Sequence, residues 1–173
     1  EKKVSDIMYI RSPVESSDSK IGFLPGDADE KLKYYNLPFA DKLDELLSKP
    51  SIESLNNQGR LQSHPLSFVR GMSWNCKAII LDEAQNCTQK EIVTLMTRIG
   101  EFSKCFILAD PDQSDLAYGK SGGFEKLQAI FSDEESRERG LYSFHFTEED
   151  IKRSDLVKFI VKKLKGLPPT VRV

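Results

Sequence analysis

Short apolar runs that end abruptly in polar residues recur along this chain, and they predict the strands of a sheet. The runs cover residues 6–10, 76–81 and 105–109, and a weaker alternation covers residues 141–146. The second and third runs are continuously apolar, which is typical of strands buried on both faces of a parallel sheet. We therefore expect four strands, of which two are buried strands of a parallel sheet.

Between these runs, apolar residues recur at helical spacing. After a long ordered loop with a turn at Pro25-Gly26, the spacing predicts a helix over residues 39–47 that follows Pro38 and stops at Pro50. Thr88 and Glu91 form a capping box before a stripe that ends at Gly100. Further stripes predict helices over residues 124–131 and 154–166. Strands that alternate with helices predict an α/β fold with a mostly parallel sheet.

Composition narrows the class of protein. The 173 residues are 39% hydrophobic, which suits one globular domain. Because the net charge is -2, nucleic acid could be bound only by a local basic patch and not by the overall charge. The cationic residues that cluster are interpreted first as a solvated helix face, with such a patch as the alternative; they are Lys152, Arg153, Lys158, Lys162, Lys163 and Lys165. No apolar run approaches the length of a membrane span. Three cysteines without a C-x-x-C pair predict reduced core thiols, and together these features predict a cytoplasmic protein without membrane contact.

Polar side chains follow three of the predicted strands where each strand ends. They are Arg11, the pair Asp82-Glu83, and Asp110 with Gln113. Parallel strands share a direction, so these groups should meet at one edge of the sheet, where α/β proteins bind their ligands.

Residues 79–83 have the form of a Walker B motif, in which one acid serves Mg²⁺ and the next faces the attacking water. Gln113 has the chemistry to contact a γ-phosphate or that water. The alternatives are an acidic turn at Asp82 and a proline-containing turn at Asp110.

Motifs along nearly the whole chain resemble the PhoH-like family, which is itself similar to the first motor domain of superfamily 1 helicases. They are Ile10-Arg11-Ser12-Pro13, Gly22-Phe23-Leu24-Pro25-Gly26, Phe68-Val69-Arg70-Gly71, Asp82-Glu83-Ala84-Gln85-Asn86, Thr97-Arg98-Ile99-Gly100, Asp110 with Gln113, Asp115-Leu116, Ser121-Gly122, and residues 146–153. The resemblance implies a RecA-like three-layer sandwich that binds ATP and Mg²⁺.

The resemblance also implies roles for single residues. Asp82 would be the magnesium-side acid, Glu83 the catalytic base, Gln85 a coupling residue and Gln113 the γ-phosphate sensor. Further nucleotide contacts would come from Asp110, Arg11 and Arg70, and the charge of the phosphates would be stabilised by Arg98 and Arg153. Each arginine could equally form a surface ion pair.

One family element is missing from the chain, namely the glycine-rich P-loop. Gly119-Lys120-Ser121 does not fit, because the motif requires glycine where Ser114 stands. We therefore interpret residues 1–173 as a single RecA-like ATPase core without its N-terminal P-loop strand and helix. We expect this strand, loop and helix to occupy roughly 25 to 40 residues upstream.

The sequence leaves three functions open. The first is an ATPase, the second an ATP-driven RNA or DNA helicase or translocase, and the third a non-catalytic assembly protein that retains the fold. The resemblance suggests a hexameric ring, and related proteins are encoded by phages. Any RNA or single-stranded DNA binding should be weak, because few lysines cluster.

Overall fold

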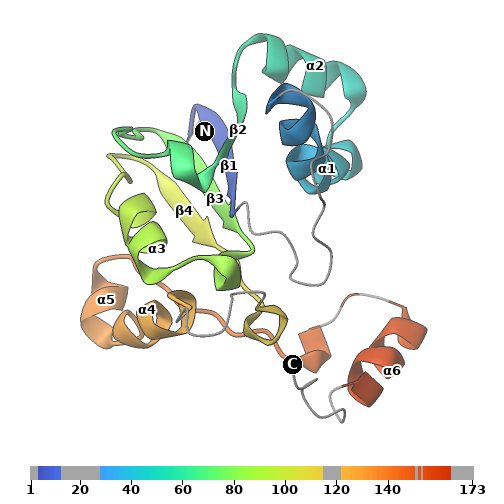
Figure 1. The fold of residues 1–173 in the computed structure, drawn as a ribbon, viewed down its shortest axis with the longest axis vertical. Helices are drawn as coiled ribbons and strands as arrows, with labels where there is room; N and C mark the ends of the chain where they lie inside the picture. Colours follow the sequence, from blue (N-terminus) through green and yellow to red (C-terminus); the bar gives the residue numbers. More distant parts are fainter. Residues whose placement is uncertain (1–3, 13–27, 115–121, 151, 153, 165–173) are drawn as a thin grey trace. The chain divides into compact units, whose positions relative to one another are not determined.

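The computed structural model describes residues 4–12, 28–114, 122–150, 152 and 154–164. The predicted turn at Pro25-Gly26, the loop at Gly119 and the side chain of Arg153 lie outside these residues. The chain divides into two compact units, Glu1–Ile130 and Phe131–Val173 (Figure 1).

The first unit contains the sheet and most of the helices. Its elements are β1 (Asp6–Arg11), α1 (Ala28–Leu46), α2 (Lys49–Asn57), β2 (Leu61–Pro65), η1 (Leu66–Phe68), β3 (Lys77–Asp82), η2 (Ala84–Asn86), α3 (Gln89–Met96), β4 (Lys104–Ile107), η3 (Pro111–Gln113) and α4 (Phe124–Ile130), where η marks a short 3-10 helix. The second unit contains α5 (Glu134–Glu138), η4 (Glu148–Asp150) and α6 (Asp155–Leu164).

The four strands form one sheet in the order β2-β1-β3-β4, and every neighbouring pair is parallel. In the register, Arg11 stands opposite Asp82, and Leu81 stands opposite Ile107. The sheet confirms the predicted α/β class and is consistent with a RecA-like fold. It also brings the carboxyl ends of β1, β3 and β4 to one edge.

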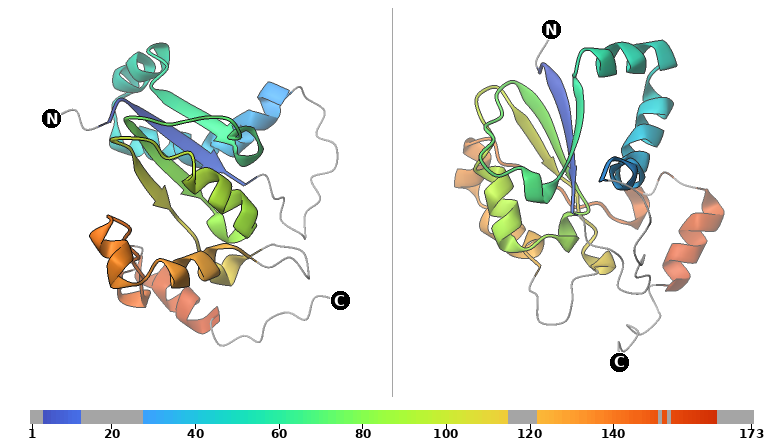
Figure 2. Two further views of the ribbon diagram at one scale, coloured as in Figure 1. Left: turned by 90° about the vertical axis from the view of Figure 1, so that its left-hand side faces the viewer. Right: turned by 45° about the horizontal axis from the view of Figure 1, so that its top comes forward.

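Helices lie on both faces of the sheet. Figure 2 shows α1 on one face, and α3 and α4 on the other. The ring of Tyr9 stacks on Phe39 of α1, so the neighbouring residues Met8 and Ile10 point to the α3 face. Both are buried there with Ile79, Leu81, and Ile92 and Leu95 of α3. This layer is the core of the unit.

The α1 face of the sheet is less covered toward β4. Tyr9, Ile80 and Phe106 are register partners and therefore share this face. Tyr9 is buried beneath α1, Ile80 is half-buried, and Phe106 is 50% exposed. Among the described residues no strand pairs with the outer edge of β4.

The start of β3 is held by the turn that follows α3. Trp74 is 2% exposed, and its backbone N–H donates to the carbonyl of Arg98. Gly100 closes the turn, because a Cβ atom there would lie 2.0 Å from Asn75 Oδ1. The helix itself begins with the predicted capping box of Thr88 and Glu91, and it ends at Met96, where the sequence stripe suggested an extension to Ile99.

The region of α1 and α2 corrects two predicted boundaries. Pro38 lies inside α1, whereas the sequence interpretation placed the helix after it, with loop up to about Glu30. A proline removes one helical hydrogen bond and can kink a helix without ending it. Pro50 lies in the first turn of α2, where a helix needs no bonded N–H.

The strand prediction missed one strand, β2, and was wrong at residues 141–146. β2 was not predicted, because its sequence LQSHP carries no apolar run, and its residues are only half-buried. The segment 141–146, predicted as a strand, has no regular secondary structure. Its large side chains Tyr142, Phe144 and Phe146 are exposed, so the sequence alternation has no partner strand among the described residues.

All three cysteines are free, as expected, but only part of the core prediction holds. Burial raises the pKa of the Cys87 and Cys105 thiols to about 12. Cys76 is exposed, and it occupies a left-handed turn just before β3. No helix in the described part of the chain is long and apolar enough to cross a membrane.

Candidate functional site

The carboxyl end of β3 places two acids side by side. Asp82 is the last residue of the strand, and one of its oxygens, Oδ1, accepts a hydrogen bond of 3.0 Å from the backbone N–H of Glu83. Its other oxygen, Oδ2, accepts a hydrogen bond of 2.6 Å from the hydroxyl of Tyr9 on β1. Burial and the adjacent Asp82 raise the pKa of Tyr9, so the hydroxyl keeps its proton and acts as a donor.

Glu83 leaves the strand in a left-handed backbone conformation, with φ 55° and ψ 41°. This conformation costs a residue other than glycine about 1 to 2 kcal/mol. It turns the chain into η2, and the side chain of Glu83 meets groups from two other segments. Arg11 Nη2 lies 3.4 Å from Oε1, and Gln85 Nε2 donates to Oε2 at 2.5 Å.

Gln85 connects the end of β3 to the end of β4. It is buried, and its side-chain Oε1 accepts a hydrogen bond of 3.1 Å from the backbone N–H of Asp110. Its backbone carbonyl oxygen accepts a hydrogen bond of 3.3 Å from Ser114 Oγ. Asp110 Oδ2 in turn accepts a 2.6 Å bond from Gln113 Nε2. The backbone N–H of Ala84 also donates to the carbonyl of Leu108.

These bonds form one continuous network across three strand ends, which we call the strand-end network. It comprises Tyr9, Arg11, Asp82, Glu83, Gln85, Asp110 and Gln113. The predicted meeting of the polar groups at one edge of the sheet is therefore realised in the structure.

Of the other candidate arginines, Arg98 lies elsewhere. Arg98 is near the amino end of β3, where its carbonyl binds Trp74 and its buried Nε has no hydrogen-bond partner. The six residues of β3 separate it from Asp82, about 20 Å of strand. Arg70 is exposed beyond η1, and Arg153 is outside the described residues. The structure thus brings Arg11, but not Arg98, to the acids.

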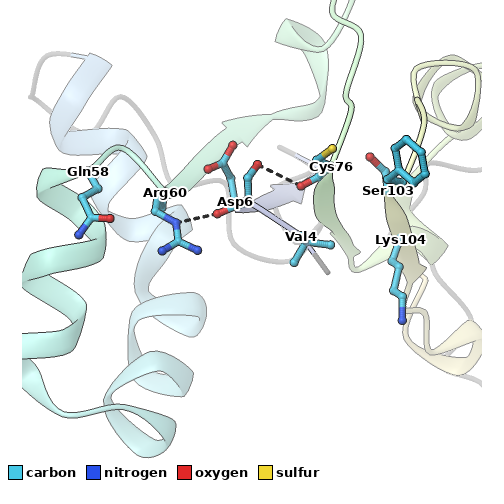
Figure 3. A pocket seen from close by; sticks show the side chains of 9 residues that line it. Val4, Asp6, Gln58, Arg60, Cys76, Ser103 and Lys104 are labelled. Carbon is cyan, nitrogen blue, oxygen red and sulfur yellow. Dashed lines mark hydrogen bonds between the residues drawn. The ribbon is translucent and has the colours of Figure 1, made fainter. Parts of the chain in front are cut away.

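A hollow of the first unit lies at the opposite edge of the sheet. This cavity of about 810 Å³ lies at the amino ends of β1, β3 and β4, between Arg60 on one side and Ser103 and Lys104 on the other (Figure 3). The Arg60 guanidinium is tied to the carbonyl of Ser5 at 2.7 Å. The cavity is therefore separate from the strand-end network.

The described residues offer a metal ion few ligands. They contain no cluster of three or more His, Cys, Asp or Glu side chains with the arrangement of a metal site. Asp82 accepts one hydrogen bond on each oxygen, and a carboxylate has about four lone-pair positions, so it retains acceptor capacity. Such a single carboxylate fits Mg²⁺, which takes most of its ligands from water and phosphates.

Comparison with known proteins agrees with this arrangement of motifs. The sequence matches the family described as PhoH-like protein over residues 1–165. The chain belongs to the PhoH-like family.

Among relatives, it is 31% identical to a PhoH-like protein of Synechocystis over 91% of the chain and 47% of that protein, and 32% identical to one of Bacillus subtilis over 92% and 48%. It is 31% identical to Protein PhoH of Escherichia coli over 87% of the chain and 42% of that protein. The PhoH-like family is known as ATP-binding. The chain spans about half the length of these relatives.

Tyr9 is the residue of the strand-end network that was not predicted from the sequence. It lies inside an apolar run and belongs to none of the motifs. Its position inside the run DIMYI made it part of an expected core strand. Only the register, which sets Tyr9 opposite Ile80 and two residues short of Asp82, shows that its hydroxyl reaches the carboxylate. A hydroxyl in an otherwise apolar strand was the available signal.

Proposed function

We propose that this chain is part of a PhoH-like ATPase core that hydrolyses ATP with Mg²⁺ through a Walker B pair and a sensor. The observation that carries the proposal is the strand-end network, in which Asp82, Glu83 and Gln113 are linked through Gln85 and Asp110. A ligand at this edge would contact all three strand ends together.

Each residue has a distinct part in the proposed reaction. Asp82 would hold Mg²⁺, which supplies charge neutralisation for the phosphates when it is bound. Glu83 would accept the proton of the attacking water, and Gln113 would sense the γ-phosphate from the end of β4. Gln85 would hold the base and the sensor in fixed positions relative to each other. Its side-chain Nε2 donates to Glu83, and its Oε1 accepts from the backbone N–H of Asp110.

The test is Glu83→Gln in the full-length protein. The amide cannot accept the proton, so phosphate release should fall about 100-fold or more, while ATP binding stays nearly intact. Glu101→Gln is the matched control, because this exposed acid lies in the turn before β4, at the opposite edge of the sheet, and should leave turnover unchanged. Wild-type turnover in Glu83→Gln would remove Glu83 from the mechanism.

Two alternatives remain as outcomes of the same assay. A full-length protein that binds ATP without turnover would favour a non-catalytic assembly role. ATP turnover stimulated by single-stranded RNA or DNA would favour a helicase or translocase, for which a hexameric ring of subunits is the assembly that we propose. The free thiols of all three cysteines support a reducing compartment such as the cytoplasm.

A further inference from the structure

Tyr9 is held at both its ring and its hydroxyl. Its ring stacks on Phe39 of α1 with 4.8 Å between centroids and 4° between planes, and the residue is 5% exposed. The stack fixes the ring, and β1 fixes the backbone in register beside β3. The hydroxyl is thus aimed at one point, the Oδ2 atom of Asp82.

The contact with Asp82 has the character of a strong hydrogen bond. At 2.6 Å it is in the range of hydroxyl donors to anionic oxygens, which are about twice as strong as neutral bonds. The Glu83 N–H holds the other carboxylate oxygen. With both oxygens tethered, the plane of the Asp82 carboxylate is set by the fold.

We propose that Tyr9 is a positioning residue that orients the Asp82 carboxylate for Mg²⁺, and that its stack on Phe39 makes the position of α1 part of that orientation. The inference rests on the proposed function, because it concerns the acid that the ATPase would offer to the metal. Groups that hydrogen-bond to metal ligands typically change metal affinity by 10- to 100-fold when removed.

A purely structural role is the competing explanation. A buried tyrosine hydroxyl needs a partner in any fold, and Asp82 could serve only that need. The two explanations differ in what the hydroxyl changes. A structural role alters stability alone, whereas a positioning role alters metal affinity.

The decisive variant is Tyr9→Phe in the full-length protein, which keeps the aromatic stack and removes only the hydroxyl. Binding of Mn²⁺ in the presence of a non-hydrolysable ATP analogue, followed by electron paramagnetic resonance, should weaken by about 10-fold or more. Metal-free binding of the analogue should not change. Tyr142→Phe, at an exposed tyrosine of the second unit, is the matched control.

A second variant provides the test if Tyr9→Phe does not fold. Phe39→Leu keeps the Tyr9 hydroxyl but removes the stack, so we expect a smaller loss of Mn²⁺ affinity, of a few-fold. Wild-type Mn²⁺ affinity in folded Tyr9→Phe, or in Phe39→Leu if Tyr9→Phe does not fold, would overturn the inference and leave the proposed ATPase standing. Failure of the wild-type protein to bind Mn²⁺ with nucleotide would overturn both.

Discussion

Arg11 contacts Glu83 directly, which suggests a role in orienting this side chain besides the nucleotide contact that the family resemblance implies. Its guanidinium lies 3.4 Å from one carboxylate oxygen, while Gln85 binds the other. Both side chains of the pair are about one-third exposed, so the charges are partly screened by water. The geometry favours an arginine that orients the proposed base.

Replacing Arg11 should therefore affect turnover more than binding. For Arg11→Gln we expect kcat to fall about tenfold, equal to about 1.4 kcal/mol of lost positioning, with the Kd for ATP unchanged. In a double-mutant cycle with Glu83→Gln the losses should not add, because Arg11 would act through Glu83. Steady-state kinetics and nucleotide titration check both points. A tenfold weaker Kd together with additive losses would instead indicate a contact with phosphate.

At this scale the sequence predicted which residues would meet, and the structure adds how they are bonded. Arg11, Asp82 and Asp110 each follow an apolar run, so strand direction alone placed them at one edge. The partners of each oxygen depend on register and on the left-handed turn at Glu83, which no local pattern encodes. Arg98 was assigned from a motif alone, and its position at the opposite end of β3 depends on the direction of α3.

Among the elements, those with a strong local pattern were predictable. β1, β3, β4 and α3 lie where apolar runs and the capping box placed them. β2 was not predictable, because this half-buried strand is defined by pairing with β1 and not by its composition. Residues 141–146 have the alternating sequence of a strand but no partner strand among the described residues, so they form no strand.

Helix α6 combines cationic and apolar side chains on one exposed element. Lys158, Lys162 and Lys163 are exposed, and Lys163 Nζ lies 5.6 Å from the ring centroid of Phe159. Leu156 and Ile160 are exposed on the same helix. Lysines beside an aromatic ring are the chemistry of weak, sequence-independent binding to single strands.

We expect labelled single-stranded RNA to bind with a salt slope of about -2, since three lysines would release about that many counterions. Replacing Lys158, Lys162 and Lys163 with Gln should abolish most of this slope in fluorescence anisotropy. The matched control replaces the exposed Lys42, Lys90 and Lys126 of the first unit, with the same change in charge. Equal effects of both triple variants, or binding that ignores salt, would show that α6 is only a solvated face.

For the molecule as a whole, the outer edge of β4 is the notable surface. Phe106 of β4 is 50% exposed and Leu108, which follows the strand, is 48% exposed, although residues 105–109 have the apolar sequence of an interior strand. Unpaired apolar edges promote aggregation, and proteins normally cover them. We therefore expect a further parallel strand on this edge in the full-length protein, in agreement with the expected P-loop strand.

Hydrogen exchange tests this expectation. The N–H of Leu108 donates to Leu81 of β3, so alternation along a parallel strand directs the amides of Cys105 and Ile107 to the outer edge. In the full-length protein these two amides should exchange at least about a thousandfold slower than free amides, equal to about 4 kcal/mol of opening free energy. Exchange at the rate of an unprotected amide would mean that the edge is open.

The buried indole of Trp74 gives the molecule an intrinsic fluorescence probe that reports on its own unit. Trp74 is the sole tryptophan of the chain, and it sits at the amino end of β3, away from the acids. Its fluorescence therefore follows the melting of the first unit, to which Trp74 belongs. A thermal transition that coincides by fluorescence and by far-ultraviolet circular dichroism would mean that both units unfold in one cooperative step.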